Sequence, residues 1–273
     1  MPMPATRFPD QPDLYGPNGF DDDPGPEWQA SSGSDDAPPI SLIWSETGPW
    51  SVSSLALHPP EAPRAPLAGL IAPGKGDLTL LYGHGGSGKG ILAAELISRV
   101  TGRLGKVLLI DAEGHLSEWS RRISGLGGDA ALVTYARHSG GKMQIELLGG
   151  LSRYALIVVD SAAYFRSDGD DWGPDGPVSM QQQASWADIP MLVLAHAAKG
   201  QPGARTSPYG SVFWHNVPRV VLELAREAPG TQTTLTVRKA TDIVGLTPGD
   251  SFEVELATGL DGITPEKLTI SSI

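Results

Sequence analysis

The strongest constraint on the fold of this 273-residue chain is a glycine-rich loop between an apolar run and an amphipathic segment. Asp77–Tyr82 (DLTLLY) has the composition of a buried β-strand, and the segment Lys89–Val100 has the spacing of a helix. The apolar residues at four-residue spacing in that helix are Leu92, Leu96 and Val100. A strand, a glycine-rich loop (GHGGSGKG, 83–90) and a helix in this order are the context in which such a loop binds phosphate. The sequence therefore predicts a P-loop.

The predicted P-loop supplies the groups that a nucleoside triphosphate needs. Its glycines allow backbone N–H groups to point at phosphate oxygens, and the N-terminus of the following helix adds a favourable dipole. Lys89 would reach the β- and γ-phosphates. The residues predicted to bind the nucleotide are Gly83, Gly85, Gly86, Ser87, Gly88, Lys89, Gly90 and Ile91. We expect the ligand to be a nucleoside triphosphate.

Gly90 departs from the usual P-loop, in which a Ser or Thr follows the lysine and ligates Mg²⁺ through its hydroxyl. Glycine has no side chain that can ligate a metal. Three explanations stay open: water fills the place, another hydroxyl serves, or hydrolysis is slow. Nucleotide binding tolerates this departure better than catalysis does.

A second apolar strand, Ala155–Asp160, ends in a carboxylate about 70 residues after the P-loop, as a Walker B element does. We expect Asp160 to hold the Mg²⁺ shell, in part through water. Ser161 follows directly, and it would either orient Asp160 or cap the next turn.

A third strand, Lys106–Ala112, carries Asp111 near its end and leads into Glu113 and His115. Ligands bind at the carboxyl edge of an open parallel sheet, and a carboxylate there can activate the water that attacks the γ-phosphate. The two-residue period of a strand would put Asp111 and Glu113 on one face. Glu113 is our candidate for the activating residue, although a helix-capping acid is the alternative. Asp111 and His115 are candidates for structural roles.

A fourth strand, Met191–Ala195, ends at His196. His196 would sense the γ-phosphate and transmit its presence to the following loop, although a structural histidine is the alternative. That loop, 197–208, carries a mild positive charge, and it would either contact a nucleic-acid backbone or remain solvated.

Composition divides the chain into two parts. Residues 1–45 are rich in Pro, Gly, Asp and Ser, which predicts a disordered acidic leader. Such a leader either is simply solvated or has a function, as a binding segment for a protein partner or as a mimic of nucleic acid. The ATPase-like domain is expected over 46–273. Residues 1–50 carry a net charge of −8 of the total −11, so the rest of the chain is close to neutral. The absence of cysteine, of an apolar run long enough to span a membrane and of a signal-like start favours a cytoplasmic protein without membrane contact.

The remaining pattern favours an α/β fold with a mostly parallel central sheet and an antiparallel C-terminal extension. Further strands are predicted at Ala131–Ala136, Arg219–Leu224, Thr233–Arg238, Ser251–Leu256 and Lys267–Ile270. Turn residues such as Pro229-Gly230 and Pro248-Gly249-Asp250 indicate that the last four pair as hairpins.

The order of these elements resembles the RecA-like P-loop ATPase core, and in particular the RepA-type replicative helicases of plasmids and phages. The segments that carry the resemblance are GHGGSGKG (83–90), LLIDAEGHLSEWSRRI (108–123), LIVVDS (156–161), LVLAH (192–196) and YGSVFWHNVPRVVLEL (209–224). The resemblance supports Glu113 as the residue that activates water and His196 as the γ-phosphate sensor. It also implies that Arg219, and more loosely Lys239, act across a subunit interface.

The resemblance further implies a homo-oligomeric ring, expected to be a hexamer with composite active sites, that acts on single-stranded DNA in replication or recombination. A nucleotide-dependent interaction module without productive hydrolysis is the alternative, and Gly90 and the acidic leader favour it. A small-molecule kinase fits less well, because no arginine-rich lid is evident. The acidic segment 165–177 argues against DNA binding by that particular loop.

Overall fold

The computed structural model describes residues 65–138, 145, 150–162, 175–198, 207–208, 213–226, 232–243, 245–258 and 265–272. The leader predicted at 1–45, the domain start predicted at 46 and most of the acidic segment 165–177 lie outside these residues. So does most of the loop 197–208. In the described part, no helix combines the length and the apolar character that crossing a bilayer requires.

The described strands form one sheet in the order β3-β2-β4-β5-β1-β6-β7-β8-β9. Their bounds are β1 Leu78–Gly83, β2 Lys106–Asp111, β3 Val133–Arg137, β4 Tyr154–Asp160, β5 Met191–His196, β6 Val220–Arg226, β7 Thr233–Ala240, β8 Ser251–Thr258 and β9 Pro265–Ser272. The block from β3 to β6 is parallel, and β6 to β9 pair antiparallel. The predicted fold class, a mostly parallel α/β sheet with an antiparallel C-terminal extension, is confirmed.

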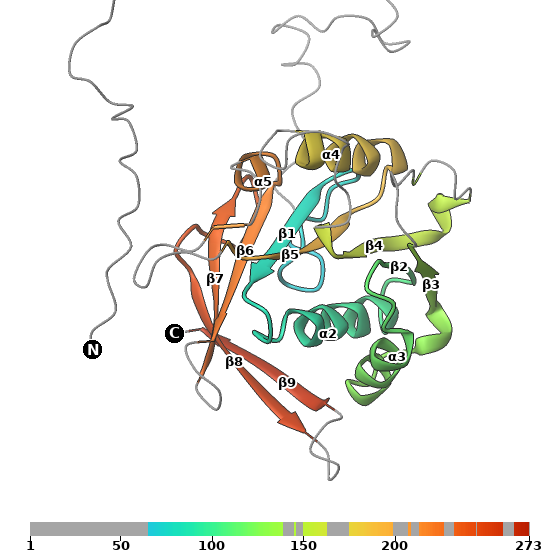
Figure 1. Ribbon diagram of the computed structural model, residues 1–273, viewed down its shortest axis with the longest axis vertical. Coiled ribbons are helices and arrows are strands. Elements are labelled where there is room, and N and C mark those ends of the chain that lie inside the picture. Colours follow the sequence, from blue (N-terminus) through green and yellow to red (C-terminus); the bar gives the residue numbers. More distant parts are fainter. Residues whose placement is uncertain are drawn as a thin grey trace, which may run out of the picture. The chain divides into compact units, whose positions relative to one another are not determined.

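Helices cover both faces of the parallel block (Figure 1). Helices α2 (Lys89–Thr101) and α3 (Leu116–Gly125) lie on one face, and α4 (Asp175–Ala187) and α5 (Phe213–Asn216) lie on the other. Two short 3₁₀ turns, η2 (Ala130–Leu132) and η4 (Leu151–Arg153), precede β3 and β4. This coverage explains why the central strands are continuous apolar runs: both of their faces are buried.

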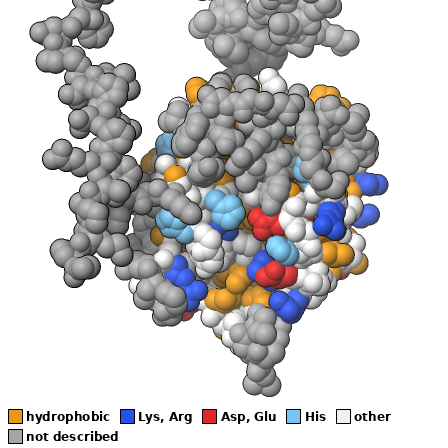
Figure 2. All heavy atoms as spheres, viewed as in Figure 1, with side chains coloured by type: hydrophobic (Ala, Val, Ile, Leu, Met, Phe, Trp, Pro, Cys, Tyr) orange, Lys and Arg blue, Asp and Glu red, His pale blue; other side chains and the backbone are white. Residues whose placement is uncertain are grey.

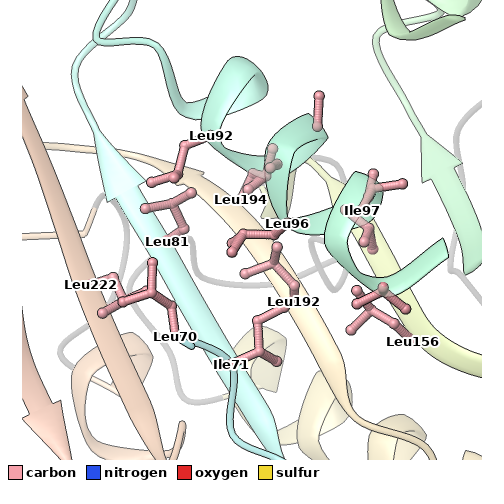
Figure 3. Packing of buried hydrophobic residues seen from close by; sticks show 14 of the residues in the cluster. Leu70, Ile71, Leu81, Leu92, Leu96, Ile97, Leu156, Leu192, Leu194 and Leu222 are labelled. Atoms are coloured by element: carbon pink, nitrogen blue, oxygen red, sulfur yellow. The ribbon is translucent and has the colours of Figure 1, made fainter. Parts of the chain in front are cut away.

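Helix α2 packs over the centre of the sheet and fixes the position of the glycine-rich loop (Figure 3). Its Leu92 and Leu96 are fully buried near Leu81 of β1 and Leu192 of β5. Burial of each leucine side chain contributes about 1.5–3 kcal/mol. The apolar face predicted from four-residue spacing is therefore the face that anchors α2.

The antiparallel extension returns to the same face of the sheet as α2. Strand β9 contacts both α2 and α3, and Leu268 belongs to the same buried cluster as the apolar side chains of α2. The turn predicted at Pro248-Gly249-Asp250 is present: the N–H of Asp250 donates to the Thr247 carbonyl over 3.0 Å, and Gly249 has φ +103°. The turn predicted at Pro229-Gly230 lies outside the described residues.

Candidate functional site

The glycine-rich loop joins the carboxyl end of β1 to the first turn of α2. Gly86 and Gly88 have φ of +76° and +96°, which side chains rarely tolerate. Gly83 lies against β6, and a Cβ there would be 2.3 Å from the carbonyl oxygen of Leu224. Gly85 has nothing within 4 Å of a Cβ position and is exposed. The loop is thus held tightly at its start and open above the helix N-terminus, as a phosphate cradle requires.

Lys89 folds back over this loop. Its Nζ donates to the carbonyl oxygens of Gly83 and His84 over 2.8 and 2.9 Å. Burial lowers the pKa of the lysine, and the charges of Asp160 and Glu113 oppose that shift. The ammonium group therefore sits at the loop with two carboxylates nearby, where a triphosphate would find a positive charge.

Asp160 ends β4 as predicted, and it is partly buried there. Burial, followed by repulsion from Glu113 and Asp111, raises the pKa of Asp160 to about 7, and Lys89 and Arg122 only partly offset this. Within the described ranges, no group of three or more His, Cys, Asp or Glu side chains could hold a metal. Carboxylate oxygens are ligands that Mg²⁺ takes, so Asp160 is the residue at the end of β4 that would hold such an ion.

Glu113 lies between two histidines. Its Oε1 is 3.7 Å from Nε2 of His196, and its Oε2 is 3.7 Å from Nδ1 of His115. Both distances exceed hydrogen-bond length, and the Glu113 side chain is 29% exposed, so its carboxylate is accessible to water. Histidine, acidic and basic side chains gather close together on the face seen in Figure 2.

The parallel register brings these strand ends together. His196 of β5 is opposite Gly83 of β1, and Asp160 of β4 is opposite Asp111 of β2. The N–H of Ala197 donates to the Gly83 carbonyl over 2.9 Å, which ties the end of β5 to the P-loop. The sheet thus collects the predicted Lys89, Glu113, Asp160 and His196 at one edge.

Asp111 has a structural role, and the expectation that it shares a strand face with Glu113 was wrong. Strand β2 ends at Asp111, so Glu113 lies in the following loop, where the two-residue period no longer applies. The buried Asp111 carboxylate accepts hydrogen bonds from the backbone N–H groups of Glu113, Gly114 and His115 over 2.8, 2.9 and 2.6 Å, and from the Tyr135 hydroxyl over 2.8 Å. Burial opposes ionisation, but these hydrogen bonds prevail and lower the pKa of Asp111.

Gly90 lies in the first turn of α2 and faces a residue that the sequence analysis did not single out, Arg122 of α3. The sequence alone does not distinguish Arg122 from the adjacent Arg121, so its position is known only from the packing of α3. Glu118, four residues before Arg122, is the one feature of the sequence that indicates a partner for it.

Ile91, predicted as a nucleotide-binding residue, packs its side chain against the core. In the described part of the chain, the hydroxyls of Ser87 and Ser161 are buried without a hydrogen-bond partner.

Arg219 and Lys239 do not join this site. Arg219 lies just before β6, its Nε donates to Asp77 over 2.9 Å, and its Nη1 is 3.4 Å from Asp242. Lys239 donates from Nζ to the Asn216 carbonyl, and burial followed by the charge of Arg219 lowers its pKa. Both lie at the amino edge of the parallel strands, one strand length of about 17 Å from the P-loop edge.

Comparison with protein families gives one match, a family model described as AAA domain, over residues 45–201. The match spans more than half of the chain and contains the P-loop, Glu113, Asp160 and His196, and it ends before Arg219 and Lys239. A search of curated proteins finds no match. The family and the site geometry together assign an ATPase-like, nucleotide-binding function, typically supported by Mg²⁺. The chain belongs to the AAA domain family of P-loop ATPase-like proteins.

Proposed function

We propose that this protein hydrolyses ATP as a RecA- or RepA-like ATPase in DNA replication or recombination, working as a ring helicase or DNA-dependent motor. The observation that carries the proposal is the convergence of Lys89, Glu113, Asp160 and His196 at the carboxyl edge of one sheet. Phosphoryl transfer to water needs a phosphate clamp, a metal ligand and a group that positions the attacking water. Each of these has a candidate at this edge.

Each residue has a distinct part in the proposed reaction. Lys89 would bind the β- and γ-phosphates in place of the loop carbonyls, and Asp160 would hold Mg²⁺, which would neutralise charge on the phosphate oxygens. Glu113 orients the attacking water and accepts its proton. His196 lies beside Glu113, and the next residue, Ala197, donates its N–H to the Gly83 carbonyl of the P-loop. We therefore propose that His196 senses the γ-phosphate and transmits its presence to the segment that follows.

The replacement Glu113→Gln tests the hydrolytic part of the proposal. We expect turnover to fall by about 10²- to 10⁴-fold, because general-base catalysis contributes that much, while ATP binding persists. The measurement is steady-state phosphate release alongside the binding of a fluorescent ATP analogue. Glu255→Gln, on the exposed part of β8, is the matched control and should keep full turnover. Equal turnover in both variants would contradict the role of Glu113.

The ring is proposed from the resemblance together with the position of Arg219. Because Arg219 lies at the edge opposite its own P-loop, it can complete an active site only in a neighbouring subunit. Its ion pairs with Asp77 and Asp242 hold the guanidinium at that edge. Lys239 lies near enough to Arg219 to sense its charge, which fits a shared basic element at a subunit interface.

A nucleotide-dependent interaction module is the second candidate. Two features of the sequence favour it: Gly90 offers no metal-binding hydroxyl, and residues 1–45 are acidic. Such a module would hold ATP without turnover and change its affinity for a partner. Long-lived ATP binding with no phosphate release, by full-length protein with Mg²⁺ and single-stranded DNA present, would favour this candidate over the motor.

A further inference from the structure

The guanidinium of Arg122 fills the space beside Gly90. A Cβ atom at Gly90 would lie 2.5 Å from Nη1 of Arg122 and 3.5 Å from its Cζ. In a P-loop with Ser or Thr at this position, the side chain that carries the hydroxyl would begin in this space. The missing side chain and the arginine are therefore complementary: Arg122 takes this place only because residue 90 is glycine.

Contacts within α3 hold Arg122 in this orientation. Its Nη2 donates to Glu118, one helical turn earlier, and its Cζ lies 6.0 Å from the ring centroid of the buried Trp119. The side chain is 22% exposed. With Nη2 turned toward Glu118, the Nη1 end of the guanidinium is directed at the first turn of α2.

The position of Arg122 beside Gly90 places its guanidinium at the first turn of α2, directly after Lys89. It is therefore a second cation at the P-loop edge, and it comes from a different helix than Lys89. Two positive groups then face the region that phosphate oxygens occupy above the N-terminus of α2.

We propose that Arg122 binds phosphate oxygens of the nucleotide directly, and so replaces the stabilisation that a P-loop hydroxyl provides through Mg²⁺. This inference rests on the proposed ATP-binding function. An arginine donates charge-assisted hydrogen bonds to phosphate without a metal, whereas a hydroxyl acts through the metal it ligates. The affinity of this protein for ATP therefore depends less on Mg²⁺ than that of a P-loop with a hydroxyl.

The test measures binding of a fluorescent N-methylanthraniloyl ATP to the full chain, in EDTA and in excess Mg²⁺. Arg122→Gln removes the charge, and Arg121→Gln makes the same change at the exposed neighbouring position. We expect Arg122→Gln to weaken binding in EDTA by roughly 10- to 100-fold, the range for hydrogen bonds to charged groups, and by less in Mg²⁺. Arg121→Gln should leave both affinities unchanged.

Gly90→Ser tests the same relation by adding a side chain at residue 90 while Arg122 is kept. The atom that its Cβ meets is the far end of a flexible arginine, so the guanidinium can move while the backbone stays in place. We expect this variant to lose affinity in EDTA and to regain it with Mg²⁺. The double variant Gly90→Ser/Arg122→Gln should bind more tightly in Mg²⁺ than Arg122→Gln alone.

The outcomes separate this inference from the proposed function. Wild-type affinity for Arg122→Gln in EDTA, or an equal loss for Arg121→Gln, overturns the role of Arg122 while leaving ATP binding intact. Failure of the wild-type protein to bind ATP in either buffer contradicts the proposed function itself. Thermal unfolding verifies each fold, and if Arg122→Gln does not fold, Gly90→Ser decides the question because it displaces the guanidinium without removing it.

Discussion

Asp111 organises the loop that presents Glu113. Four donors meet its carboxylate, three from the backbone of residues 113–115 and one from Tyr135. Because the carboxylate is fully buried, each donor would be left without a partner if its acceptor were lost. The position of Glu113 therefore depends on a residue that does not touch the substrate.

We predict that Asp111→Asn lowers the free energy of unfolding by about 2–3 kcal/mol, because an amide places a donor against backbone N–H groups and removes charge-assisted bonds. Tyr135→Phe, which removes a single donor, should cost about 1 kcal/mol. Urea unfolding of the two variants and the wild type measures both values. A cost for Asp111→Asn no larger than that for Tyr135→Phe would show that the backbone bonds contribute little.

The same residue predicts a dependence of stability on acid. The pKa of Asp111 is lower in the folded state, so its contribution is fully present above the unfolded value near 4 and is lost as the pH falls through the folded value. The wild-type protein should therefore lose more stability below pH 4 than Asp111→Asn does. The measurement is the free energy of unfolding in urea at several pH values. An equal loss of stability on acidification in the two proteins would contradict this role of Asp111.

At the residue scale, the sequence predicts the site residues that lie in a recognisable motif or directly at the end of a predicted strand. Glu113, Asp160 and His196 are predicted because parallel strands gather their carboxyl ends, and Lys89 is predicted from the glycine-rich loop; the structure brings all four to one edge. Arg122 could not be chosen this way, because its approach to Gly90 depends on how α3 packs against α2. The structural role of Asp111 also required the loop geometry.

The junction between β1 and the P-loop is fixed by close packing against β6. Gly83 allows this approach: a Cβ there would meet the Leu224 carbonyl at 2.3 Å and Ser87 Oγ at 2.8 Å. The obstacle at Leu224 is backbone, which cannot move without disturbing the pairing of β1 with β6. The first residue of the loop is thereby held to the sheet.

We predict that Gly83→Ala costs about 1–3 kcal/mol of stability, the usual range for overpacking, and also weakens ATP binding because the loop is displaced. Gly85→Ala is the control for stability in the same loop, since its Cβ would meet no protein atom within 4 Å. Thermal unfolding and titration with the fluorescent ATP analogue measure the two effects. Similar stability of both variants would show that the contact with Leu224 does not fix the loop.

At the element scale, the strands are predicted well from apolar runs, whereas helices with few buried side chains are not predicted. The predicted strands all occur, with ends displaced by no more than two residues. The central strands are recognisable because strands buried on both faces are continuously apolar, whereas β7, β8 and β9 are half-exposed and are recognisable with the help of turn residues. Two helices are not predicted from the sequence: α3 buries only Trp119 and Ile123, and α4 begins in an acidic segment. The order of the strands in the sheet could not be predicted from the sequence either, because neighbouring strands such as β1 and β5 are distant in sequence.

The whole molecule carries its candidate catalytic groups at two edges. The P-loop edge holds Lys89, Glu113, Asp160 and His196, and the opposite edge holds Arg219 and Lys239. Under the proposed function, Arg219 would complete the P-loop edge of another copy, because it lies at the edge opposite its own P-loop. Such head-to-tail contacts close into rings when the rotation between subunits permits. The arrangement is the basis on which we propose a ring, and the number of six subunits comes from the resemblance alone.

We predict that Arg219→Ala lowers turnover by about 10³-fold or more while leaving ATP binding unchanged, because an arginine finger acts on the transition state. Arg226→Ala, at the exposed end of the same strand, is the matched control. Phosphate release and ATP-analogue binding are measured for both. Because Arg219 also pairs with Asp77 and Asp242, thermal unfolding must show that the variant keeps its fold. Undiminished turnover would remove Arg219 from the proposed composite site.

The most direct measurement of the central claim is ATP turnover by the full chain across a range of protein concentrations, with and without single-stranded DNA. The account predicts Mg²⁺-supported phosphate release whose rate per subunit rises with protein concentration as composite sites form, and rises further when DNA is added. Stable ATP binding with no turnover at any concentration, with or without DNA, would contradict it.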